Sequence, residues 1–292
     1  MAERAWQGGT DGTSWMHRTL VRIVRHVPLR LMYAFVAVLV VPFYFVFSKG
    51  YGPIYRYFTQ RLGYNPVRAF FMVYRNHCRF SQVILDRFYM FSGGKFELDV
   101  ENYHLYQELA EGNDGFIILS AHVGCYELAG YSLVATKKRF NALAFGEEAE
   151  AIVENRQRLF EGTNINIIPV KDDLSHLFAI NNALDNGESV SFPSDRLVGN
   201  QRTVECPFLG APAKFPMGPF ALAAQRDLPV LTVNVMKASA KRYKVYVNRL
   251  QKEGEKREER INSYVRQYVG HLEEMLHRYP EQWFNYYDFW NN

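Results

Sequence analysis

The feature that most constrains the fold is a regular alternation of strand-type and helix-type segments between residues 115 and 250. The run GFIILSA (115–121) has no polar alternation, which favours a strand buried on both faces. Similar apolar runs lie at 141–145, 165–170, 188–192 and 228–236, and helical patterns lie between them at 126–138, 147–160, 174–187 and 217–227. RYKVYVNRL (242–250) alternates, as edge strands do. The order predicts an α/β fold, a single domain with a largely parallel central sheet flanked by helices.

Two long helices are predicted outside this alternation. One covers 66–91, and the other covers about 255–278, where the high charge indicates a mostly solvated helix. We find no internal repeat and no interdomain linker, so residues 51–292 are expected to form one domain. Residues 1–14 are polar and Gly-rich, which is typical of a disordered tail.

Residues 15–50 are expected to contact a membrane. Arg18, Arg22 and Arg25 share one helical face, a pattern typical of a basic amphipathic segment on an anionic surface. Residues 31–47 then hold 17 residues without a charge, and Pro42 predicts a kink. As a helix this run would be about 25 Å long, close to a bilayer core. We therefore expect an N-terminal hydrophobic membrane-anchor helix. A buried helix or a signal peptide with a poor cleavage site is the alternative.

Composition excludes several classes of function. The net charge of +4 is too small to indicate nucleic-acid binding, but it suits anionic lipid headgroups as well as an ordinary basic surface. The three cysteines are too widely spaced for a disulfide framework or a zinc site. The sequence has no H-E-x-x-H, G-x-S-x-G, G-x-G-x-x-G or Walker A pattern. We therefore expect no metal and no other cofactor.

One histidine and one acid could perform base catalysis. His122 and Glu127 lie in SAHVGCYELAG, directly after the predicted strand 115–121. No other histidine in the chain is followed by an acid at this spacing. A carboxylate behind a histidine fixes its tautomer and stabilises the imidazolium, which suits the activation of a hydroxyl. Because Gly124 allows a sharp turn, Glu127 could reach back from a following helix. A structural histidine is the alternative reading.

A second group of candidates lies in residues 192–235. Asp195 and Arg196 follow a predicted strand, so they should share a sheet edge with His122, although an ordinary surface ion pair would look the same. Gly199 marks a turn. CPFLGAPAKFPMGP (206–219) is expected to be a rigid, irregular apolar loop that lines a chain-shaped cavity or serves only as a connection.

These segments resemble the lysophospholipid acyltransferase superfamily, and within it the bacterial lipid A late acyltransferases of the lauroyl/myristoyl type. AHVGCYE is similar to the family's His-x4-acid block, often HFGNWE. The segment from VSFPSDR onward is similar to its second block, and YPEQWFNYY is similar to its PEQW segment. Departures are Cys125 and Tyr126 in the first block, Asp195–Arg196 in the second, and WFNYYDFW in place of a basic W-x-H-x-R.

The resemblance implies roles for individual residues. His122 would be the base and Glu127 its partner. The substrate-binding residues would be Asp195, Arg196, Gly199, Phe208 and Gly210, with Arg156 or Arg158 as a basic residue between the blocks.

The resemblance also implies substrates and a place in the cell. The donor would be acyl-carrier protein or acyl-CoA, and the acceptor a lipid hydroxyl on a lipid A precursor, an aminolipid or a lysolipid. The enzyme would work at the bacterial inner membrane with its catalytic domain facing the cytoplasm.

Two other functions use the same features. The dyad could activate water, which would give a thioesterase or lipase, or His122 could be structural in a non-catalytic lipid-binding protein. A transferase that uses acyl-carrier protein also needs a basic docking face. Lys137, Lys138 and Arg139 are candidates for it, although a solvated helix end would look the same.

Overall fold

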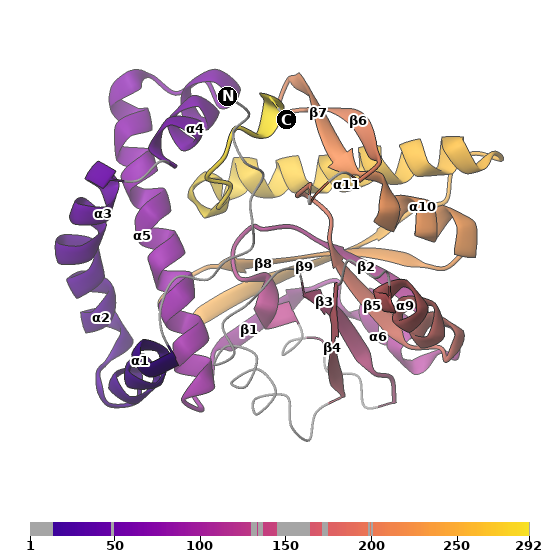
Figure 1. Cartoon of the computed structure of the whole chain (residues 1–292), viewed down its shortest axis with the longest axis horizontal. Helices are drawn as coiled ribbons and strands as arrows, with labels where there is room; N and C mark the ends of the chain where they lie inside the picture. Colours follow the sequence, from indigo (N-terminus) through magenta and orange to yellow (C-terminus); the bar gives the residue numbers. More distant parts are fainter. Residues whose placement is uncertain are drawn as a thin grey trace.

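The computed structural model describes residues 14–47, 50–129, 133, 137–144, 164–170, 175–197, 199 and 201–291. Within these residues, seven strands form one sheet in the order β1-β9-β8-β2-β5-β3-β4 (Figure 1). They are β1 (Glu97–Glu101), β2 (Phe116–Ser120), β3 (Phe140–Ala144), β4 (Ile165–Pro169), β5 (Ser189–Pro193), β8 (Val230–Lys237) and β9 (Arg242–Leu250). Strands β8, β2, β5, β3 and β4 run parallel, while β9 and β1 run the opposite way. The predicted α/β fold with a largely parallel sheet is confirmed.

The helices and short turns complete the chain order. The α-helices are α1 (Ser14–His26), α2 (Leu29–Phe35), α3 (Val41–Phe47), α4 (Tyr51–Arg56), α5 (Pro66–Phe91), α6 (Tyr103–Glu111), α9 (Ser175–Asp185), α10 (Met217–Arg226) and α11 (Arg257–Arg278). Two π-helical segments are η1 (Val36–Val40) and η2 (Tyr57–Arg61), and three 3-10 turns are η3 (Tyr126–Leu128), η4 (Pro280–Gln282) and η5 (Phe289–Asn291). The helix predicted at 66–91 is confirmed as α5. The helix predicted at 147–160 and the tail at 1–13 lie outside the described residues.

Strand β2 lies at the centre of the core because every one of its residues is buried. Ile117 and Leu119 point into a core shared with α9, α10 and α11, whereas Phe116 and Ile118 point into a second core shared with α6. This explains the apolar run without alternation, since a strand covered on both faces has no solvent side. The buried position of β2 fixes where its last residues, and hence His122, emerge.

Helix α11 differs from the prediction of a mostly solvated helix. Its charged residues cover one face, but the other face is buried and includes Tyr264, Tyr268 and Leu272. Figure 1 shows α11 lying along one face of the sheet, above β8 and β9. High overall charge therefore concealed an amphipathic helix that covers half of the core.

Two strand predictions are corrected. Strand β9 is not an edge strand, because β1 pairs with its outer side. Residues 206–219 are not an irregular loop but contain most of a hairpin in which β6 (Thr203–Phe208) pairs antiparallel with β7 (Ala211–Pro216). The turn residues Leu209 and Gly210 both have positive φ, at 47° and 77°. Such a turn lets prolines lie at the paired ends of a two-stranded sheet, where ladder hydrogen bonds are few.

The N-terminal helices form a layer at one side of the sheet, packed on the long helix α5 (Figure 1). Among the described residues, no single helix is both long and apolar enough to cross a membrane. The segments Arg18–His26 and Leu29–Phe45 meet that criterion only as a pair, with a 120° bend between them. The sharp bend therefore precedes Pro28, whereas the predicted kink at Pro42 falls inside a segment that is helical from residue 29 to residue 47.

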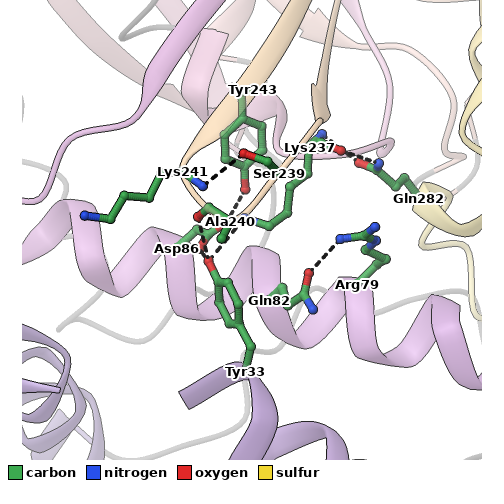
Figure 2. A network of polar contacts seen from close by, with 10 residues as sticks. All are labelled: Tyr33, Arg79, Gln82, Asp86, Lys237, Ser239, Ala240, Lys241, Tyr243 and Gln282. Carbon is green, nitrogen blue, oxygen red and sulfur yellow. Dashed lines mark hydrogen bonds and ion pairs between the residues drawn. The ribbon is translucent and has the colours of Figure 1, made fainter. Parts of the chain in front are cut away.

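A buried polar network ties this layer to the sheet (Figure 2). Asp86 of α5 accepts hydrogen bonds from the hydroxyls of Tyr33 and Tyr243 and forms an ion pair with Lys237 of β8. The side chains of Asp86 and Lys237 are 0% and 1% exposed, so each charge depends on the other. Gln282 extends the network, because its amide bonds the backbone of Lys237 at 2.8 and 2.9 Å. The N-terminal helix is thus linked through α5 and β8 to the segment that follows α11.

Candidate active site

Two neighbouring strands place His122 beside Asp195. In the parallel pair of β2 and β5, Ser120 lies opposite Pro193. His122 and Asp195 each come two residues after these partners, so both emerge at the carboxyl edge of the sheet, where open α/β folds place their ligands. A hydrogen bond of 2.9 Å from the amide of Ser194 to the carbonyl of Ser120 extends the pairing past the strand ends.

The carboxylate of Asp195 holds His122 at two points. Nδ1 of His122 lies 2.6 Å from Oδ1 of Asp195, and the backbone amide of His122 donates to Oδ2 at 2.9 Å. The His122 side chain is 14% exposed, whereas that of Asp195 is 0% exposed. Because Nδ1 faces the carboxylate, the tautomer with a proton on Nδ1 is favoured, and Nε2 is left with its lone pair.

The electrostatics favour a neutral histidine beside an ionised aspartate. Burial, followed by the positive charge of Arg196, holds the pKa of His122 below its ordinary value, against opposing effects of Asp195 and Glu127. Burial raises the pKa of Asp195, but the interactions with His122 and Arg196 outweigh it and leave this pKa below its ordinary value. At neutral pH the pair can therefore accept a proton at Nε2.

The turn after His122 requires Gly124. Its φ is +53°, and a Cβ at this position would lie 2.0 Å from the carbonyl oxygen of Val235. The amide of Gly124 donates to the carbonyl of Gln282 at 2.8 Å, and the amide of Cys125 donates to that of Val235 at 2.8 Å. These two amides and the amide of His122 all have partners, so none of the three is available to stabilise an oxyanion.

Arg196 fastens the C-terminal segment to this edge. Its guanidinium donates to the carbonyl of Phe284 at 2.8 Å and to Oδ1 of Asn285 at 2.9 Å. The amide of Phe284 in turn donates to the carbonyl of His122 at 3.3 Å. The segment that resembles the family's PEQW block thus forms one wall beside His122, which sequence spacing did not indicate.

Glu127 has a different nearest charge from the one we expected. Its carboxylate Oε2 lies 2.7 Å from Nε of Arg87 on α5, and both side chains are mostly buried. The structure therefore places Asp195 on Nδ1 of His122 and pairs Glu127 with Arg87. Glu127 still acts on His122 through its charge, which raises the pKa of the histidine. The residues after Glu127 form only the 3-10 turn η3 before the description is interrupted at residue 130.

The other predicted site residues lie in several places. Phe208 is fully buried in an aromatic cluster with Trp283 and Phe289. Gly210 is in the β6–β7 turn, and Gly199 lies in the described segment after β5, with a φ of +62°. Arg156 and Arg158 lie outside the described residues. Among the docking candidates, Lys138 is buried and donates to the carbonyl of Asp114, while Lys137 and Arg139 are exposed just before β3, at the amino edge of the sheet and so opposite His122.

Comparison with known proteins identifies the family. The family model of the bacterial lipid A biosynthesis acyltransferases matches residues 91–291. The chain belongs to this family. It is therefore an acyltransferase of lipid synthesis, as the resemblance implied, and the His122 edge lies within the matched region. No curated protein matches the chain.

One solved structure shows a limited likeness to this acyltransferase. The 1-acyl-sn-glycerophosphate (LPA) acyltransferase from Thermotoga maritima superposes with a TM-score of 0.41 and 17% sequence identity, covering 90% of this chain and 98% of that one.

Sequence reasoning missed two members of the site. Arg87 was counted only as part of a helix, and Asn285 only as part of a resembling segment. Asp195 was assigned to substrate binding, although its position two residues after β5 matches that of His122 after β2. This shared offset is a signal that the sequence does contain once the two strands are taken as neighbours.

Proposed function

We propose that the protein transfers a fatty acyl chain from a thioester donor to a lipid hydroxyl, with His122 as general base and Asp195 as the carboxylate that orients it. The observation that carries this proposal is the 2.6 Å contact between Nδ1 of His122 and Oδ1 of Asp195 at the carboxyl edge of the sheet. Only His122 of this pair has a partly exposed side chain, so it is the member that can meet a substrate.

The reaction needs one proton acceptor that later returns the proton. Nε2 of His122 takes the proton of the acceptor hydroxyl while its oxygen forms a bond to the thioester carbonyl carbon. The tetrahedral intermediate then breaks its carbon–sulfur bond, and the leaving thiolate takes the proton from the imidazolium. Asp195 remains ionised throughout and stabilises the imidazolium, because its carboxylate faces Nδ1.

Glu127 supports the same base from a second direction. Its charge raises the pKa of His122, and Arg87 balances that charge at 2.7 Å. Since both Glu127 and Arg87 are mostly buried, their pairing keeps an anion near the histidine without leaving it uncompensated. We therefore assign Glu127 an electrostatic role in setting the strength of the base.

The donor is an acyl-carrier protein thioester or acyl-CoA, and the acceptor is a lipid A precursor, an aminolipid or a lysolipid. These assignments rest on the family and on the arrangement of the site, and the reaction itself does not distinguish them. The same base could activate water, which would make the protein a thioesterase. A transferase releases thiol only when an acceptor is present, so the two activities separate in one assay.

We also propose that α1 to α3 bind the inner membrane, with the catalytic domain on the cytoplasmic side. Large apolar side chains on these helices are exposed, among them Val38 at 69% and Phe43 at 72%. The patch continues onto α5 with Val67 and Phe71. Exposed apolar surface on this scale marks an interaction site in a folded protein. The basic residues of α1 would meet anionic headgroups beside it.

The test is an acyl-transfer assay with the full chain in detergent, radiolabelled acyl thioester donors and a panel of lipid acceptors. Both thiol release and labelled lipid are measured. We expect thiol release to require an acceptor and to be lost in His122→Ala and strongly reduced in Asp195→Asn. Full activity of His122→Ala would exclude the proposed mechanism, and thiol release at the full rate without acceptor would identify a thioesterase.

A further inference from the structure

A small cavity near the active site is lined by hydrogen-bond donors that have no partner. It lies between the helical segment of α4 and η2 and the C-terminal residues 283–291, which adjoin each other in Figure 1. Its lining includes Trp283, Asn285, Arg56, Gln60 and Arg61. Its volume is about 80 Å³, whereas one water needs only about 10–15 Å³ on the same measure. The cavity can therefore take a group larger than one water.

Two buried N–H groups lining this cavity lack acceptors within the described structure. Nε1 of Trp283 and Nδ2 of Asn285 have no hydrogen-bond partner, although their residues are only 1% and 2% exposed. The orientation of the Asn285 amide is fixed by chemistry, because Nε of Arg196 can only donate and therefore faces Oδ1. Nδ2 must then point away from Arg196. A buried donor without an acceptor costs free energy, so the site is built to receive an acceptor.

Two arginines add positive charge to the same lining. Arg56 forms an ion pair of 3.0 Å with Asp288, which also lines the cavity, and the guanidinium of Arg61 lies 4.6 Å from the ring centre of Trp290. The two guanidinium groups and one carboxylate leave one excess positive charge. A lining of N–H donors with excess positive charge matches an anion that offers several acceptor oxygens.

The cavity is connected to the catalytic pair through one residue. Asn285 is held by Arg196, and Arg196 directly follows Asp195 in the chain. The C-terminal segment here lacks the basic residues that the family pattern carries, yet Arg56 and Arg61 supply positive charge to it from α4 and η2. A ligand held in this cavity would thus lie beside the wall that borders His122.

We propose that this cavity binds a phosphate ester of a substrate, with the N–H groups of Trp283 and Asn285 and the guanidinium of Arg61 donating to its oxygens. The inference deepens the proposed acyl transfer and rests on it for the identity of the ligand. Two substrates carry such a group: the phosphopantetheine arm of the acyl donor and the headgroup of a phosphorylated lipid acceptor. Both would place an anion here while the reacting atoms lie at His122.

The test is isothermal titration of the full chain in detergent with inorganic phosphate, coenzyme A and dihexanoyl phosphatidic acid. Asn285→Asp keeps the size and the acceptor oxygen for Arg196 but replaces the Nδ2 donor with an oxygen. Arg61→Gln removes one cation at a partly exposed position and so keeps the test valid if Asn285→Asp fails to fold. Asn181→Asp makes the same chemical change at an exposed position on α9 and is the matched control.

We expect each cavity variant to weaken phosphate-ester binding at least about tenfold, because a charge-assisted hydrogen bond is lost, while Asn181→Asp binds like the original protein. Tighter binding of coenzyme A would assign the cavity to the donor, and tighter binding of phosphatidic acid would assign it to the acceptor. Unchanged binding in both cavity variants, or no binding of any of the three ligands, would overturn the proposal and leave a water-filled cavity. His122→Ala should bind as before, so a failed mechanism remains distinguishable from a failed binding site.

Discussion

Oδ1 of Asp195 lies 2.6 Å from Nδ1 of His122, while Oδ2 accepts the backbone amide of the same histidine at 2.9 Å. One carboxylate therefore fixes both the ring and the backbone of His122. Such an arrangement constrains the imidazole more strongly than a single contact, because rotation of the ring would break one bond and movement of the loop would break the other.

Replacing the aspartate should separate orientation from folding. In Asp195→Asn the side-chain amide can still accept the backbone N–H through its oxygen, but it no longer stabilises the imidazolium. We expect kcat to fall by roughly 10³–10⁴-fold, the size seen when a histidine base loses its carboxylate. The measurement is steady-state transfer alongside a thermal melt. An unchanged kcat in a folded variant would remove Asp195 from the mechanism.

The pH dependence of transfer should reflect two opposing neighbours of His122. Since the active form is neutral and its pKa is lowered, the acid limb of kcat/KM should lie below the ordinary histidine value of about 6.5. Glu127→Gln removes a charge that raises this pKa, so the limb should move to lower pH. Arg196→Gln removes a charge that lowers it, so the limb should move to higher pH. Shifts of both variants in the same direction would contradict this account of the electrostatics.

Gly124 should tolerate no side chain. Alanine there would combine a positive φ with a Cβ only 2.0 Å from the Val235 carbonyl, and we expect the free energy of unfolding to fall by about 2 kcal/mol or more. Gly218 provides the control, because a Cβ there meets nothing within 4 Å and its helix α10 should gain up to about 1 kcal/mol from alanine. Urea denaturation of both variants measures the contrast, and equal stabilities would disprove it.

The buried ion pair should respond asymmetrically to substitution. Asp86→Ala leaves Lys237 charged and uncompensated, so we expect a loss of about 3–5 kcal/mol of stability. Tyr33→Phe removes only one of the hydrogen bonds to Asp86 and should cost about 1 kcal/mol. Chemical denaturation compares them. If Asp86→Ala cost no more than Tyr33→Phe, the pair would not be a buried charge interaction.

Membrane binding should depend on the exposed apolar face of the N-terminal layer. Phe35→Asn combined with Phe43→Asn should reduce partition into vesicles that contain anionic lipid by at least about tenfold. Phe178→Asn is the control, because Phe178 is 81% exposed but lies on α9. Point substitutions are preferable to deletion of residues 1–47, since Tyr33 and Ala37 both accept or donate hydrogen bonds to α5. Vesicle flotation that is equal for all three proteins would place membrane binding elsewhere.

The sequence alone determined the fold class, because periodicity depends on which faces of an element are buried. The run 115–121 could only be a strand covered on both sides, and the long helix α5 was bounded correctly by its own pattern. His122 was found in the same way, as a polar residue at the end of a buried strand.

Only the tertiary structure decided which residues face one another. Pairing of β2 with β5 brings Asp195 to His122 across 73 positions, while Arg87 on α5 reaches Glu127 from outside the alternating region. The buried face of α11 and the inner place of β9 likewise depend on neighbours far along the chain. Spacing along a chain records local geometry, whereas the partner of a buried charge is set by how strands and helices pack. For this reason the sequence identified the base, and packing identified the carboxylate that holds it.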